Sequence, residues 1–174
     1  MITCAKCGDT PLTSLIKEKD VCPFCGFDLK KPVSELTEDE ISELMASYDY
    51  TVLEDGGYRI EGVKNIRDIA LRGFVCTPGF ITEIGDEAYC CCKFLAGVEL
   101  HDGLRSIGNG AFAHCRDLFD MFIPATVTHM GQAVFEKCYD LQTIYCAASE
   151  KPEGWDDAWL EGCDATVEWN ATID

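Results

Sequence analysis

Basic residues are scarce in this sequence. It contains 14 Lys and Arg against 31 Asp and Glu, which gives a formal net charge of −17. Affinity for nucleic acids, like attraction to anionic membranes, comes mainly from Lys and Arg close to the phosphates. The charge therefore argues against a general nucleic-acid-binding surface and against a role on a membrane surface.

Long hydrophobic runs and an export signal are also missing. No stretch of about 18 apolar residues occurs, so we expect no membrane-spanning helix. The first residues have neither a basic n-region nor an apolar h-region, which predicts a cytoplasmic location. In a chain without such a signal, 12 cysteines favour metal ligation and reduced thiols over a disulfide framework.

A catalytic motif is likewise missing. The three histidines, His101, His114 and His129, lie far apart, and none belongs to a recognisable Ser/His/Asp or Cys/His arrangement. Nucleophilic and acid–base catalysis both need an oriented partner of that kind. We therefore expect a protein that is not an enzyme.

The residues that are present divide the chain into three parts. An apolar fraction of 47 % is sufficient for a packed core, and 174 residues suit one main domain with a small module. We predict the small module at 1–33, a connecting segment at 34–61 and a repeat domain at 62–174.

The small module contains two Cys-x-x-Cys pairs separated by 14 residues. Zinc takes four soft ligands at tetrahedral corners, and two intervening residues let both thiolates of a pair reach one metal. The alternative, thiol–disulfide chemistry, normally uses a single pair in a thioredoxin-like setting, which is missing here. The segment resembles the zinc-ribbon family, and that resemblance implies the ligands Cys4, Cys7, Cys22 and Cys25. One structural zinc ion per chain would supply folding energy that about 30 residues cannot gain from a core.

The connecting segment predicts a helix followed by a hairpin. Thr37 and Glu40 form the capping-box pattern T-x-x-E, and Ile41 begins an apolar face at helical spacing. Apolar residues alternate over 48–52, the turn residues Glu-Asp-Gly-Gly follow at 54–57, and alternation resumes at 58–60. We expect the hairpin to cover the first exposed edge of the repeat domain.

A 23-residue period organises the rest of the chain. Similar residues recur at this spacing in four columns: Gly85, Gly108 and Gly131; Tyr89, Phe112 and Phe135; Cys92, Cys115 and Cys138; Leu95, Leu118 and Leu141. The same register predicts strands at positions 75, 98, 121, 144 and 167. Periods of about 20–29 residues with leucine-like positions are typical of leucine-rich-repeat solenoids, in which stacking buries a continuous core.

The unit from Ile107 to Leu118 has the pattern I-G-x-x-A-F-x-x-C-x-x-L. This pattern resembles the BspA-like (Treponema-type) leucine-rich repeat, over roughly residues 62–170. The resemblance implies an α/β solenoid, built as a short leucine-rich repeat domain that follows the zinc ribbon, the helix and the hairpin. It also implies a scaffold that binds other proteins.

The repeat register predicts where the conspicuous side chains lie. The column of Cys92, Cys115 and Cys138 is expected in the core, because a buried free cysteine behaves as a small hydrophobe. Trp155 and Trp159 lie four residues apart and are expected to seal the open end of the last coil.

Alternation along the strands predicts a partner-binding face. If positions 98, 121 and 144 point inward, then Glu99, Phe122 and Tyr145 point outward, with Asp120 in the next outward row. An aromatic pair bordered by acids suits a protein partner with an apolar anchor and basic neighbours. The alternative is that Phe122 and Tyr145 only pack on each other as a cross-strand pair.

The sequence thus favours non-enzymatic protein–protein interaction with an unidentified protein partner. The alternative is a zinc-ribbon nucleic-acid or transcription accessory factor, which the shortage of Lys and Arg disfavours.

Overall fold

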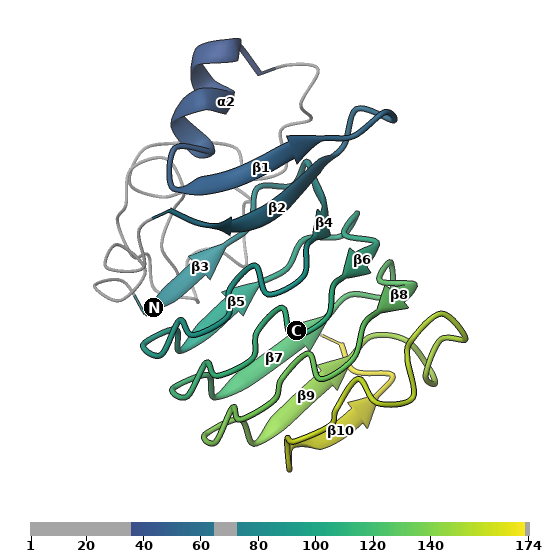
Figure 1. Cartoon of the computed structure of the whole chain (residues 1–174). Coiled ribbons are helices and arrows are strands. Elements are labelled where there is room, and N and C mark those ends of the chain that lie inside the picture. Colours follow the sequence, from purple (N-terminus) through teal and green to yellow (C-terminus); the bar gives the residue numbers. More distant parts are fainter. Residues whose placement is uncertain (1–35, 65–72, 173–174) are drawn as a thin grey trace.

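The computed structural model describes residues 36–64 and 73–172 (Figure 1). The first described element is a short helix, α2 (Glu38–Leu44), and a hairpin of β1 (Tyr48–Val52) and β2 (Tyr58–Val63) follows it. The predicted zinc module at 1–33 lies outside the described residues. The division of the chain at positions 33 and 61 stays a prediction.

Helix α2 begins at the capping box. The Thr37 N–H donates to Glu40 Oε2 at 2.9 Å, and the Glu40 N–H donates to Thr37 Oγ1 at 3.2 Å. Leu36 and Ile41, which flank the start of the helix, both pack against the core. Strands β1 and β2 then pair antiparallel across the Glu-Asp-Gly-Gly turn. The predictions of a capped helix and of a hairpin are therefore confirmed.

Residues 73–172 wind into a β-solenoid with two rows of strands. These strands are β3 (Phe74–Cys76), β4 (Ile81–Ile84), β5 (Gly97–Glu99), β6 (Ser106–Ile107), β7 (Asp120–Ile123), β8 (His129–Met130), β9 (Thr143–Cys146) and β10 (Thr166–Trp169). One row runs β2–β4–β6–β8, and the other contains β3–β5 and β7–β9–β10, all paired in parallel. The five predicted strand positions all fall in the second row, and the predicted solenoid is confirmed.

The hairpin joins the solenoid directly. Strand β2 pairs in parallel with β4, so the antiparallel β1–β2 unit covers the first edge of the β4–β6–β8 row (Figure 1). Tyr48 at the start of β1 is buried, and its ring packs on Tyr89 of the first return segment. The hairpin therefore closes the start of this row as the sequence predicts.

Columns of identical or similar side chains fill the core. The rings of Tyr89, Phe112 and Phe135 are stacked, with centroids 5.2 and 5.7 Å apart and interplanar angles of 11° and 6°. The Cys92, Cys115 and Cys138 side chains are buried beside them. Because the chain advances by one strand spacing per repeat, each residue lies on its counterpart in the previous repeat. The predicted core position of the cysteine column is confirmed, and the ring column is buried with it.

The return segments between the two rows are turns, with no helix among residues 73–172. Their backbone N–H groups donate to carbonyls one repeat ahead, for example Tyr89 to Ala111 at 2.8 Å and Phe112 to Val134 at 2.9 Å. Gly108 and Gly131 of the glycine column lie close to the preceding return segment. A Cβ on Gly108 would stand 2.5 Å from the Asp86 backbone nitrogen, so a larger residue would force the segments apart.

Two tryptophans close the far end of the solenoid. Trp155 and Trp159 are buried, and Trp155 Nε1 donates to the Val127 carbonyl at 3.0 Å. Trp159 packs edge-on against Phe135. In β10 the inward-facing Val167 and Trp169 are only half-buried, because they lie on the last described strand. The prediction that the tryptophans seal this end is confirmed.

Candidate interaction surface

The strand face of β7 and β9 is built by simple alternation. In β7, Met121 and Ile123 are buried, Asp120 is exposed and Phe122 is half-buried. In β9, Ile144 and Cys146 are buried while Thr143 and Tyr145 are half-buried. The apolar residues of this face that point outward are therefore aromatic, whereas the inward ones are aliphatic or sulfur-containing.

Phe122 and Tyr145 are register partners on adjacent parallel strands. Adjacent strands lie about 4.8 Å apart, so the two side chains stand next to each other. Their rings make neither a stacked nor an edge-on contact among the aromatic pairs of the described residues. Both residues are half-buried, so each ring is partly open to solvent.

Acidic groups border this aromatic pair on the same face. Asp120 is exposed and is paired with Thr143, two positions before the aromatic pair. Glu168 of β10 is exposed and lies in register with Tyr145. The strand face therefore combines apolar rings with negative charge.

Glu99, the fourth predicted residue, lies on β5, which is hydrogen-bonded to β3 and not to β7. It is half-buried, and its backbone carbonyl accepts hydrogen bonds from the Thr77 N–H and hydroxyl, each at 3.1 Å. The fold thus brings Asp120, Phe122 and Tyr145 together on one sheet and leaves Glu99 on the neighbouring pair of strands.

Three exposed aromatic residues were missed by the sequence analysis. Phe94, Phe119 and Tyr139 are 59 %, 48 % and 68 % exposed, in the turns that lead into β5, β7 and β9. The Arg116 guanidinium lies 5.8 Å from the centroid of the Tyr139 ring. A signal existed for Phe119 and Tyr139, because they occupy repeat phases at which the other repeats carry small, polar or charged residues. All three aromatic residues therefore lie next to the N-terminal ends of strands β5, β7 and β9.

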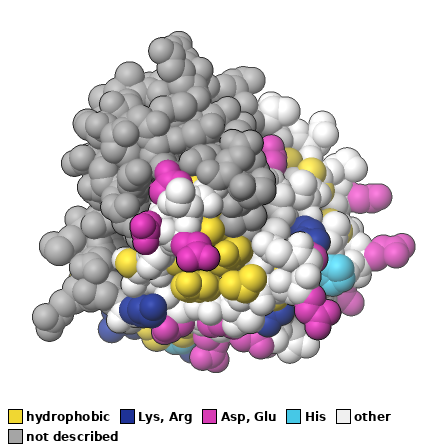
Figure 2. Space-filling view, turned by 90° about the horizontal axis from the view of Figure 1, so that it is seen from above, with side chains coloured by type: hydrophobic (Ala, Val, Ile, Leu, Met, Phe, Trp, Pro, Cys, Tyr) yellow, Lys and Arg dark blue, Asp and Glu magenta, His cyan; other side chains and the backbone are white. Residues whose placement is uncertain are grey.

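The hairpin end carries a different surface. Seen from above, acidic side chains lie beside a hydrophobic patch on the described part (Figure 2). Strand β1 carries two exposed apolar side chains, Tyr50 and Val52, which are 39 % and 56 % exposed. Tyr50 packs against Tyr58 within the hairpin. This aromatic residue is remote in the strand order from β7 and β9, which makes it a suitable reference for the strand face.

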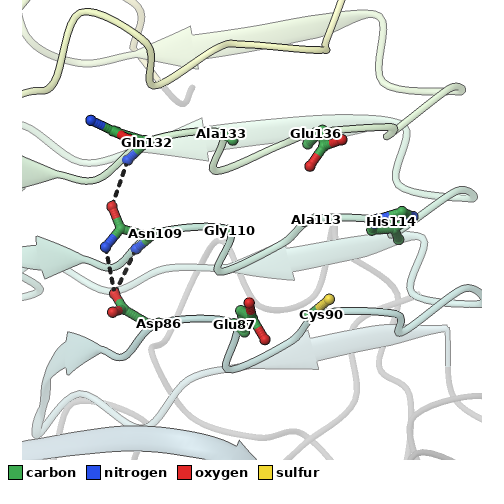
Figure 3. A pocket seen from close by; sticks show the side chains of 10 residues that line it. All are labelled: Asp86, Glu87, Cys90, Asn109, Gly110, Ala113, His114, Gln132, Ala133 and Glu136. Carbon is green, nitrogen blue, oxygen red and sulfur yellow. Dashed lines mark hydrogen bonds between the residues drawn. The ribbon is translucent and has the colours of Figure 1, made fainter.

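A shallow pocket of about 350 Å³ lies on the return segments (Figure 3). Asp86, Asn109 and Gln132 form a ladder along one side, in which Asp86 Oδ1 accepts from the Asn109 N–H at 2.7 Å. Asn109 Oδ1 in turn accepts from the Gln132 N–H at 2.9 Å. The remaining lining residues are Glu87, Cys90, Gly110, Ala113, His114, Ala133 and Glu136.

The pKa values of two ionisable groups in this pocket are shifted in opposite directions. Lys137 donates to Glu136, which holds the pKa of that carboxyl below its ordinary value. Burial and the neighbouring Cys91 thiol raise the pKa of Cys90 to about 11. Within the part of the chain that the structure describes, no three His, Cys, Asp or Glu side chains are grouped to hold a metal ion. The four predicted zinc ligands lie outside that part.

The core thiols are chemically protected. Burial raises the pKa of Cys92, Cys138 and Cys146 to about 12 each, and raises that of Cys115 as well. Cys115 Sγ donates to the Tyr89 carbonyl at 3.1 Å. Because the thiolate is the reactive form, these side chains pack in the core and are poor nucleophiles and metal ligands.

The three histidines lie in different environments and do not form a cluster. His101 is buried, His114 is half-buried at the pocket, and His129 is exposed on β8 with its Nδ1 3.0 Å from Thr128 Oγ1.

No described helix has the length and apolar character needed to cross a bilayer.

Solved structures of leucine-rich repeat proteins are similar to this chain. The chain is similar to a leucine-rich repeat protein from Bacteroides ovatus ATCC 8483, with 21 % identity and a TM-score of 0.52 over 71 % of this chain and 36 % of that one. It is also similar to one from Bacteroides capillosus ATCC 29799, with 21 % identity and a TM-score of 0.49 over 72 % of this chain and 95 % of that one. The first of these supports the solenoid fold alone. No curated protein matches the chain.

The sequence pattern described as the BspA type leucine rich repeat region matches residues 63–155, in six copies. The match covers more than half of the 174 residues and includes residues 73–155 of the solenoid. The chain therefore belongs to the BspA-type leucine-rich repeat family.

Proposed function

We propose that this protein is a non-enzymatic protein-interaction module whose strand face, centred on Phe122 and Tyr145, binds a protein partner. The observation that carries the proposal is the register of this pair, in which two half-buried rings stand side by side on parallel strands. Solenoids use such faces as extended binding surfaces.

The charges on this face define the kind of partner. Asp120 and Glu168 are exposed beside the aromatic pair, and Glu99 lies on the adjacent strand. The partner segment then supplies an apolar side chain for the rings and Lys or Arg for the acidic border. Aromatic anchors contribute most of the affinity in such interfaces, while the charged border governs the association rate and its salt dependence.

The test compares capture of partners by three forms of the full chain. The Phe122→Ser, Tyr145→Ser double variant should lose a partner that the wild type recovers from nuclease-treated native extract. The matched control is Tyr50→Ser, which removes an exposed aromatic from the hairpin end and should retain that partner. Circular dichroism and thermal unfolding must show an intact fold for both variants. If the double variant recovers every wild-type partner, the strand face is not the binding site.

A structural zinc ion at Cys4, Cys7, Cys22 and Cys25 is part of the proposal, supported by the spacing of the two cysteine pairs. Elemental analysis of protein purified without chelator should give one equivalent of zinc. Cys22→Ser should lose the zinc, and we expect it to leave the unfolding transition of the solenoid in place, because the described solenoid core is built from residues 75–165. Metal-free protein with all four thiols reduced would refute this part.

A cytoplasmic location completes the proposal. The cysteines whose side chains the structure describes are free thiols, which suits a reducing compartment. Fractionation of the native cells with detection of the untagged protein tests this location, and recovery at the cell surface would exclude it.

A further inference from the structure

Three consecutive cysteines, Cys90 to Cys92, occupy the first return segment, yet the repeat uses only one of them. Cys92 is buried in the core column. Cys90 is half-buried and lines the pocket, while Cys91 is exposed and has a positive φ of 64°. Their Sγ atoms are 3.5 Å apart. Two accessible thiols thus lie side by side without a role in packing.

The separation of these two sulfurs suits a bridging atom better than a direct disulfide. Adjacent Cα atoms lie about 3.8 Å apart across a trans peptide, whereas disulfides usually span about 4.4–6.8 Å between Cα atoms. A central atom with bonds to sulfur of about 2.3 Å, as zinc has, holds two sulfurs roughly 3.5–4 Å apart. The thiols of Cys90 and Cys91 already stand at this separation.

We propose that Cys90 and Cys91 form a dithiol binding site for trivalent arsenicals that carry one organic group. In the reaction, two arsenic–oxygen bonds of the hydrated arsenical break and two arsenic–sulfur bonds form. Each departing hydroxyl takes one thiol proton and leaves as water. Arsenic stays trivalent throughout, so the step needs neither an oxidant nor a reductant.

The surroundings of the dithiol favour such a neutral ligand over a divalent metal ion. Glu87 and Glu136 line the same pocket as Cys90, and negative charge together with partial burial disfavours a thiolate. A divalent ion needs thiolates, whereas the arsenical reacts with neutral thiols and releases no net proton. Two thiols also complete the ligand set of a singly substituted arsenic, and the described residues offer no group of three metal ligands.

The pocket leaves room for the organic group. Ala113 takes the repeat position of Cys90 in the next return segment, and together with Gly110 it gives the pocket small lining residues beside Glu87 and His114 (Figure 3). The pocket is open to solvent and has a volume of about 350 Å³. This volume is sufficient for a phenyl group on arsenic.

Phenylarsine oxide is the probe for this site. Titration of the full chain, followed by intact-mass measurement, should show one more bound equivalent for the wild type than for Cys90→Ser or Cys91→Ser. Loss of either thiol removes the second, intramolecular bond and should weaken binding at this site by about 10²–10⁴-fold. The matched control is Cys163→Ser, which removes a half-buried thiol elsewhere and should retain full uptake.

Comparison among the variants separates this site from the cysteine pairs at residues 1–33, since those pairs are the same in all four proteins. Cys91 is exposed, so Cys91→Ser keeps the test decisive if Cys90→Ser unfolds. Fragmentation of the adduct should place arsenic on Cys90 and Cys91 together. The proposal is overturned if Cys91→Ser binds as many equivalents as the wild type with equal affinity, or if the adduct lies on other cysteines.

Discussion

The middle of the solenoid, residues 85–146, and its two ends, residues 36–63 and 152–172, are stabilised in different ways. In the middle, the rings of Tyr89, Phe112 and Phe135 stack almost parallel. At the ends, Tyr48 meets Tyr89 at an interplanar angle of 73° and Trp159 meets Phe135 at 79°. The parallel stack thus stops at an edge-on ring on each side.

The difference shows how a short repeat protein is terminated. A residue that stacks on its own kind presents the same surface to the next repeat, so the geometry is propagated. An edge-on Tyr or Trp presents another surface, so the column stops there. We therefore expect substitutions in the middle to lower the stability of the whole domain and those at the ends to act locally.

The largest expected effect comes from Phe112→Ala. Phe112 is fully buried with a ring on each face, so its loss should lower the free energy of unfolding by about 3–5 kcal/mol. Urea unfolding followed by circular dichroism measures this change. The control Phe119→Ala removes an exposed ring and should stay within about 0.5 kcal/mol of the wild type. Equal losses for the two variants would contradict the importance of the stack.

A smaller loss is expected for Cys115→Ser, again in the middle. The substitution replaces a fully buried thiol with a more polar hydroxyl, which can still donate to the Tyr89 carbonyl, so the cost should be about 1 kcal/mol. Cys163→Ser, at a half-buried position near the C-terminal end, should cost less than about 0.5 kcal/mol. The same urea titration compares them, and a Cys163 variant less stable than the Cys115 variant would reverse our comparison.

At the N-terminal end, Thr37→Ala should cost about 1 kcal/mol by removing the capping hydrogen bond to the Glu40 N–H. The effect should be local, so amide hydrogen exchange should accelerate in α2 while the amide of Phe112 keeps its protection. Faster exchange at Phe112 under native conditions would show that this end is coupled to the middle.

A small gain is expected for Ala133→Gly in the third return segment. Ala133 has a positive φ of 49°, a region that costs an L-residue about 1–2 kcal/mol and costs glycine nothing. After subtraction of glycine's entropy cost, the gain should be about 0.5 kcal/mol. The control Ala125→Gly, at an exposed position without a positive φ, should lose stability in the same thermal unfolding assay. A loss in both variants would argue against strain at Ala133.

The smallest effect concerns the junction between the middle and the C-terminal end. Asp156 accepts from the Ala158 N–H at 2.8 Å and from Gln132 Nε2 at 3.0 Å, and these hydrogen bonds hold its pKa below the ordinary 3.8. Because the folded pKa is the lower one, this stabilisation is complete above the unfolded value and is lost as pH falls through the folded value. Asp156→Asn should flatten the acid limb of a plot of unfolding midpoint against pH. An unchanged acid limb would show that the ionised Asp156 does not stabilise this junction.

Much of the middle could be predicted from the sequence, because one period places every repeat in the same environment. The strand positions, the ring column and the cysteine column followed from a spacing of 23 residues. The local signals at the N-terminal end were equally readable, since the Thr37–Glu40 cap involves residues three apart. The conformation of the return segments could not be predicted in this way, because it depends on backbone hydrogen bonds to the next repeat.

The candidate site was predicted in part. Alternation along β7 and β9 placed Phe122 and Tyr145 outward, and the parallel register made them neighbours. The separation of Glu99 was not readable, since the same period places β5 beside both β3 and β7, and only the backbone geometry decides which pair is hydrogen-bonded. Phe94, Phe119 and Tyr139 were missed because they lie in turns, where alternation does not predict the direction of a side chain.

The sequence by itself determined the solenoid, its period, the inward columns and the capped helix, because each follows from residues at fixed spacing. Only the tertiary structure decided which strands pair, how the edge-on rings end the stack, and how far each outward side chain is exposed. It also placed the thiols of Cys90 and Cys91 in contact at the surface. The physical reason is that periodicity specifies which residues share an environment, whereas exposure and contact depend on the packing of neighbouring segments.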